Sequence, residues 1–161
     1  MHHATLDAGM AMTFAALSAS AARNRLFAQK AKAEGNRPVA LLLSAMAEGE
    51  EIMARRALIA LRGKIFPLDD YLAEIADTKG RSAAVSDERA GAAAKNGDEN
   101  TADAYRRFGA VTRNHGEQLA GLGRETALYV CQVCGYIAAD EAPDRCPVCN
   151  AVAKKFKAHS L

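Results

Sequence analysis

The chain has 161 residues, half of them hydrophobic, and a formal net charge of +2, so it can bury a sizeable core. Its lysines and arginines alternate with acidic residues rather than clustering, which argues against a nucleic-acid-binding protein. No segment approaches the roughly 20 apolar residues of a membrane span, and the N-terminus lacks the features of a secretory signal.

Two long helices are predicted at the start of the chain. Residues 5–34 are rich in alanine, with apolar residues every three or four positions, and Gly35 follows as a C-terminal cap. Asn36 and Pro38 then begin a second helix that extends to about Leu61. So short a turn makes the two helices antiparallel. Four methionines of these helices are expected to fill the core: Met10, Met12, Met46 and Met53.

Two further helices are predicted after a change in composition. Residues 63–76 carry turn-forming residues and only a short apolar patch, which predicts a crossover connection containing one short helix. A third helix is predicted from about Thr78 to Lys95, and a fourth from about Asn100 to Gly123. Four helices with a long connection between the second and third predict a ferritin-like four-helix bundle.

The most specific motif lies near the C-terminus, where two Cys-x-x-Cys pairs are separated by eleven residues. Four thiolates on two tight turns form a tetrahedral site for one metal ion: Cys131, Cys134, Cys146 and Cys149. Zinc would make this a structural site, and iron would make it a one-electron carrier. Gly135 directly after the first cysteine pair and Pro147 between the two cysteines of the second pair favour iron over zinc. With every cysteine used for metal, none remains for disulfides, so we expect a cytoplasmic protein.

Two stretches resemble the rubrerythrin family. Ala22-Arg23-Asn24-Arg25 is similar to part of the first rubrerythrin helix, and the cysteine pairs followed by Phe156 resemble the rubredoxin-like domain. The resemblance implies a mainly α protein: a ferritin-like four-helix bundle at residues 1–124 and a small rubredoxin-like, zinc-ribbon-like β domain at 125–161. It also implies a homodimer.

The family's di-iron site, however, is not matched by the residues of this bundle. The resemblance places its ligands at Ala19, at Glu50 and Met53, at Thr78 and Arg81, and at Thr112 and His115. Only Glu50 and His115 keep a metal-binding side chain, and these two cannot hold two iron ions. We therefore expect no di-iron centre and no peroxidase activity. Glu50 and His115 are expected to form a hydrogen-bonded pair, or else a residual mononuclear site that also uses Met53; in a third alternative, one or both point to solvent.

Three functions remain open from the sequence. The first is electron transfer through one iron ion in the four-cysteine site, with an unidentified redox partner protein and no enzymatic activity of its own. The second is a non-redox adaptor stabilised by zinc that binds a partner protein. The third is a rubrerythrin-type peroxidase that is still active with an unusual site.

Overall fold

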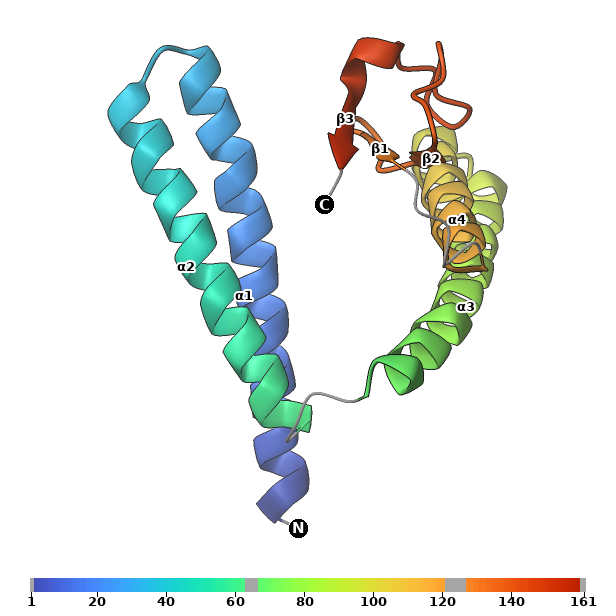
Figure 1. Cartoon of the computed structure of the whole chain (residues 1–161). Coiled ribbons are helices and arrows are strands. Elements are labelled where there is room, and N and C mark those ends of the chain that lie inside the picture. The colour runs from blue at the N-terminus through green and yellow to red at the C-terminus, as the bar shows by residue number, and fades with distance from the viewer. Residues whose placement is uncertain (1, 63–66, 121–126, 160–161) are drawn as a thin grey trace. The chain divides into compact units, whose positions relative to one another are not determined.

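The computed structural model describes residues 2–62, 67–120 and 127–159 (Figure 1). Most of them are helical, in α1 (His2–Ala33), α2 (Arg37–Arg62), α3 (Leu68–Lys95) and α4 (Glu99–Ala120). The strands are β1 (Leu128–Cys131), β2 (Ile137–Ala139) and β3 (Phe156–His159), with a short 3₁₀ helix, η1, at Ala153–Lys155. The predicted fold class, mainly α with a small C-terminal β domain, is confirmed.

The chain divides into two compact units, Met1–Phe66 and Pro67–Leu161. The first contains the α1–α2 hairpin, and the second contains the α3–α4 hairpin and the strands. The boundary that we expected between residues 124 and 125 lies outside the described residues. No helix in the described part of the chain is both long and apolar enough to cross a membrane.

The two hairpins turn in the same way. Gly35 and Gly97 both have φ of +76° and end α1 and α3. The N–H of the next residue in each turn, Asn36 or Asp98, donates to a carbonyl five residues back, at 2.8 and 3.0 Å. This is the Schellman motif, in which glycine meets the left-handed backbone at no steric cost. The Asn36 and Asp98 side chains then accept N–H bonds from the first turn of α2 and α4, so each pair of residues ends one helix and begins the next.

Small side chains form the seam between the helices of each hairpin. In each helix two buried small residues are spaced seven positions apart, a repeat that keeps one stripe of an antiparallel helix facing its neighbour. A methyl group or a hydrogen at these positions lets the helix axes approach closely. The seam residues are Ala21 and Ala28 against Ala47 and Ala54 in the first hairpin, and Ala83 and Ala90 against Ala102 and Gly109 in the second.

Two predictions about the helices are wrong. The four methionines do not fill the hairpin cores but are 36 to 74% exposed, because the alanine seam has no room for a long side chain. The crossover with a separate short helix expected at 63–76 is also wrong for the part of it that the structure describes, because residues 68–76 already belong to α3, which begins at Leu68. Asp69 and Asp70 are acidic residues of the first turn of α3, where the helix dipole favours them, rather than turn formers.

The strands form an antiparallel sheet in the order β2-β1-β3. Leu128, Tyr129 and Val130 of β1 pair with Ala139, Ala138 and Ile137 of β2, and the other edge of β1 pairs with β3. Cys131 is the last residue of β1 and Cys134 lies in the turn that follows, so the sheet holds one wall of the predicted metal site.

Candidate metal centre

The two Cys-x-x-Cys turns have the same backbone geometry. In each turn the N–H of the residue after the second cysteine, Gly135 or Asn150, donates to the carbonyl of the first cysteine at 2.9 Å. Both residues have positive φ, +87° and +60°. The N–H of each first cysteine donates to the carbonyl five residues ahead, at 2.9 Å for Cys131 and 2.8 Å for Cys146. Glycine and asparagine are residues that tolerate this left-handed conformation, so the sequence dictates two matching turns.

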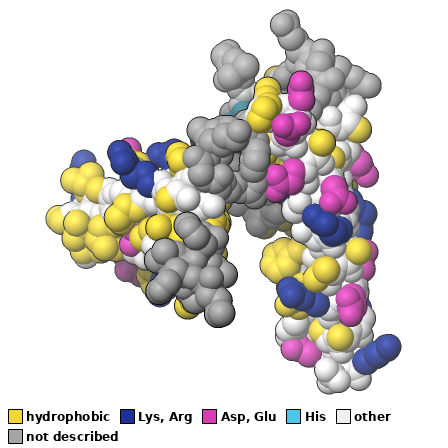
Figure 2. Space-filling model, turned by 90° about the horizontal axis from the view of Figure 1, so that it is seen from below, with side chains coloured by type: hydrophobic (Ala, Val, Ile, Leu, Met, Phe, Trp, Pro, Cys, Tyr) yellow, Lys and Arg dark blue, Asp and Glu magenta, His cyan; other side chains and the backbone are white. Residues whose placement is uncertain are grey.

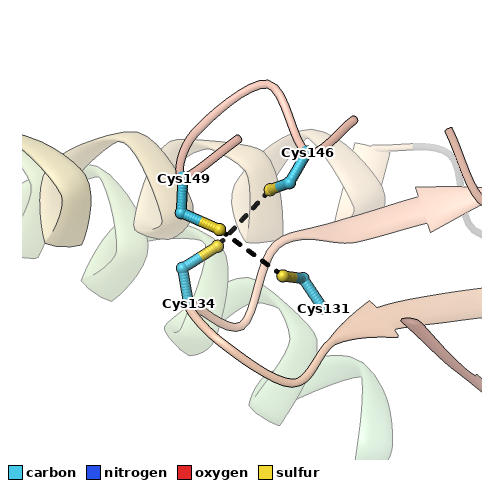
Figure 3. Close-up of side chains that lie close together, drawn as sticks. All are labelled: Cys131, Cys134, Cys146 and Cys149. Carbon is cyan, nitrogen blue, oxygen red and sulfur yellow. Dashed lines mark hydrogen bonds between the residues drawn. The ribbon is translucent and has the colours of Figure 1, made fainter. Parts of the chain in front are cut away.

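The four sulfur atoms meet at one point between these turns (Figure 3). All lie within 4.8 Å of one another, with 3.7 Å between Cys131 Sγ and Cys149 Sγ and 3.5 Å between Cys134 Sγ and Cys146 Sγ. Metal–sulfur bonds of about 2.3 Å in a tetrahedron require sulfur–sulfur distances of about 3.8 Å. The cysteines are therefore positioned to bind a metal ion, and this geometry suits iron and zinc equally.

Backbone N–H groups surround the sulfurs and set their acidity. Burial acts against the Cys131 thiolate, but N–H groups of Val133 and Cys134, helped by neighbouring thiols, outweigh it and lower the Cys131 pKa to about 7. At Cys134 burial prevails and raises the pKa, although the Tyr136 N–H opposes it. Burial likewise raises the pKa of Cys149 against the Ala151 N–H. The Cys131 thiolate thus forms readily near neutral pH, whereas Cys134 and Cys149 need the charge of a bound cation to lose their protons.

The sheet is fastened to α4 by two adjacent polar side chains. Asn114, which is 5% exposed, donates from Nδ2 to the Ile137 carbonyl at 3.0 Å and accepts the Ile137 N–H on Oδ1 at 2.8 Å. His115 Nε2 lies 2.8 Å from the Gly135 carbonyl oxygen. Asn114 thus satisfies both backbone groups of Ile137 on the edge strand β2. This role could not be predicted from the sequence, because an asparagine in a helix carries no local signal that it is buried.

Glu50 and His115 each have a hydrogen-bond partner within their own unit. The Glu50 carboxylate accepts bonds from Ser20 Oγ and Asn24 Nδ2, both at 2.8 Å, across the α1–α2 seam. His115 bonds to Gly135, as described above. Among the described residues, the four cysteines are the one group of three or more potential ligands gathered closely enough to hold a metal ion.

Comparison with known proteins agrees with this site and with the fold. Residues 129–157 match the family model of the rubrerythrin rubredoxin-like domain. No curated protein matches the sequence significantly. Among solved structures, nigerythrin in its fully reduced, all-ferrous state and in its partially reduced state each give a TM-score of 0.56 at 18% identity. A mixed-valence state of nigerythrin gives 0.55 at the same identity.

Each of these matches covers 95% of this chain and 86% of the nigerythrin chain, so the likeness in fold extends over nearly the whole molecule. At 18% identity it concerns the fold, whereas the family match concerns the cysteine domain itself. The predicted resemblance is therefore confirmed: the chain has a fold similar to that of nigerythrin, and its residues 129–157 match the rubredoxin-like domain of rubrerythrins.

Proposed function

We propose that this protein transfers single electrons through one iron ion bound by Cys131, Cys134, Cys146 and Cys149, and that it has no di-iron peroxidase activity. The observation that carries the proposal is the convergence of four sulfurs, within 4.8 Å, in a domain that matches the rubrerythrin rubredoxin-like family. Iron bound by four thiolates supplies a one-electron couple between its ferrous and ferric states.

The polypeptide around the sulfurs suits such a couple. N–H groups of Val133 and Cys134 point at Cys131, that of Tyr136 at Cys134, and that of Ala151 at Cys149. Each hydrogen bond offsets negative charge on a sulfur. This stabilisation is greatest when the site is reduced, because the reduced iron–sulfur unit carries more negative charge. These bonds are fixed by the turns, so little reorganisation is required when an electron arrives.

A route for electrons is available at the surface. Cys131 and Cys146 are buried, but Cys134 and Cys149 are half-buried and line a cavity of about 360 Å³. Val133, which is 60% exposed, and Phe108, which is 59% exposed, lie on the same cavity. Asn100, Asp103 and Arg107 also line this cavity, and such a mixed apolar and polar border around two accessible ligands suits brief contact with a redox partner protein, which we propose as the electron source.

The proposed loss of the di-iron centre is supported by the surroundings of Glu50. Its carboxylate already accepts hydrogen bonds from Ser20 and Asn24. These neutral donors take the place of the cations that would otherwise offset its negative charge. Ala19, Met53 and Thr112 offer no carboxylate or imidazole. On α3, Arg81 forms an ion pair with Asp77 at 3.0 Å, and its side chain is 71% exposed. We do not extend the metal site to Glu50 and His115.

We further propose that the protein is a cytoplasmic homodimer that binds neither membranes nor nucleic acid. Large apolar side chains are exposed on the α1–α2 hairpin, including Leu26, Phe27, Leu41 and Leu42, and yellow side chains cover much of this hairpin at the left of Figure 2. Such residues favour burial against another surface. Sedimentation equilibrium should give twice the chain mass, and a monomer at micromolar concentration would exclude the dimer.

A second function, a non-redox adaptor stabilised by zinc, is kept because the sulfur geometry fits zinc as well as iron. Metal analysis and a visible spectrum of protein purified from iron-replete native cells distinguish the two. One iron per chain with sulfur-to-iron charge-transfer bands supports the electron carrier, and zinc alone supports the adaptor. Three irons per chain would contradict the absence of a di-iron centre. Glu50→Gln is the matched control, which should leave the iron content unchanged.

A further inference from the structure

His115 on α4 reaches a peptide group beside the metal site. Its Nε2 lies 2.8 Å from the Gly135 carbonyl oxygen, and the ring is half-buried. A carbonyl oxygen only accepts hydrogen bonds, so Nε2 carries the proton and donates it. The loop packs against α4 at this point, since a Cβ on Gly135 would lie 3.7 Å from Val111 Cγ1, in ordinary van der Waals contact.

The other end of that peptide group contacts a sulfur. The carbonyl of Gly135 and the N–H of Tyr136 belong to one trans peptide, and the Tyr136 N–H donates to Cys134 Sγ. The imidazole N–H, the peptide and the sulfur therefore form a continuous chain of hydrogen bonds. A donor on the carbonyl oxygen polarises the amide and makes its N–H a stronger donor.

We propose that His115 is a positioning residue that raises the reduction potential of the metal site through the Gly135–Tyr136 peptide. The inference rests on the proposed iron site. When a redox partner gives one electron, ferric iron becomes ferrous and the negative charge on the iron–sulfur unit increases by one. A stronger N–H bond to Cys134 stabilises this reduced state more than the oxidised state, so the potential rises.

Asn114 supports the arrangement by holding the next residues of the same loop. Its two bonds to Ile137 fix β2 against α4. The carbonyl of Tyr136, in the peptide shared with the Ile137 N–H, accepts the Cys131 N–H at 2.9 Å. Successive peptides after Cys134 are thus held by successive residues of α4. This separates two roles, since Asn114 holds the sheet while His115 acts on the peptide that contacts a ligand sulfur.

The test compares the iron-loaded wild type with His115→Phe, which removes the donor, and His115→Gln, which retains an N–H donor. Spectroelectrochemical titration should show that His115→Phe shifts the ferric-to-ferrous ratio about threefold toward ferric iron, which is about 28 mV at 59 mV per tenfold change. His115→Gln should keep a reduction potential close to that of the wild type. His159→Phe, at an exposed histidine of β3, is the matched control and should leave the potential unchanged.

A second measurement follows the hydrogen bond itself. In the zinc-loaded protein, the Tyr136 amide proton should move upfield in His115→Phe and stay near its wild-type position in His115→Gln. His115→Asn, whose shorter side chain does not reach the Gly135 carbonyl, serves if the phenylalanine variant fails to fold. Equal potentials in all variants, or an equal fall with glutamine and phenylalanine, would overturn the proposal. A wild type without iron would contradict the proposed function instead, and the amide shift would still test the hydrogen-bond chain.

Discussion

At the level of single residues, the metal centre contains side chains that can be predicted from the sequence and contacts that cannot. The cysteines and Gly135 could be identified from spacing and turn chemistry alone. The partners of Asn114 and His115 could not, since both residues belong to a helix whose neighbours are decided by packing. The hydrogen bond of His115 goes to the loop that follows Cys134.

We expect Asn114→Ala to loosen the sheet from α4. The substitution leaves the N–H and carbonyl of Ile137 without their partner, and an unsatisfied buried polar group costs about 1–3 kcal/mol. Hydrogen exchange at the Ile137 amide should accelerate, and the free energy of unfolding should fall by about that amount. Glu117→Ala, at an exposed position on the same helix, is the control. Unchanged exchange at Ile137 would show that Asn114 does not hold the strand.

At the level of helices, the composition of the chain has a direct structural reason. Alanines at seven-residue spacing line both seams, so each pair of helices packs closely and the large apolar residues lie outside the seam. Apolar periodicity predicted the four helices, but the expectation that four methionines fill the core of the first hairpin is wrong. The periodic pattern weighs large side chains most heavily, whereas close packing in this fold selects the smallest ones.

The seam predicts a clear difference between two alanines of α2. Ala47 is 0% exposed and faces α1, so Ala47→Leu should force the helices apart and lower the free energy of unfolding by about 1–3 kcal/mol. Ala45→Leu adds the same atoms at an exposed position and should change stability by less than about 0.5 kcal/mol. Chemical denaturation measures both. Equal effects would mean that the seam does not pack as described.

At the level of the whole molecule, the two units depend on different forces. The α1–α2 hairpin is formed by helix packing, whereas the sheet of the second unit has three short strands and two loops that meet at the cysteines. A domain of this size buries too little apolar surface to be stable alone, and metal binding then contributes directly to its folding. The bonds from Asn114 and His115 add attachment to α4 but do not replace the metal.

Removing the metal should therefore unfold one part of the chain selectively. After chelation we expect peptides within residues 128–159 to lose hydrogen-exchange protection, while peptides of α1 and α2 serve as the internal control and keep theirs. Far-UV circular dichroism should retain most of its helical signal. Because the thiols must lose protons to bind, release should become easier as the pH falls. Full protection of residues 128–159 without metal would contradict a folding role for the site.

The sequence by itself determined four helices, the glycine turns between paired helices and the identity of the four cysteines, because caps, periodicity and ligand spacing are local properties. The small C-terminal β domain was indicated by the resemblance to rubrerythrins. Only the tertiary structure decided that alanines form the seams, that residues 68–95 are one helix, and that Asn114 and His115 hold the loop beside Cys134. These features depend on which surfaces approach each other. A polar group or a void left between two surfaces destabilises the protein only in the folded state.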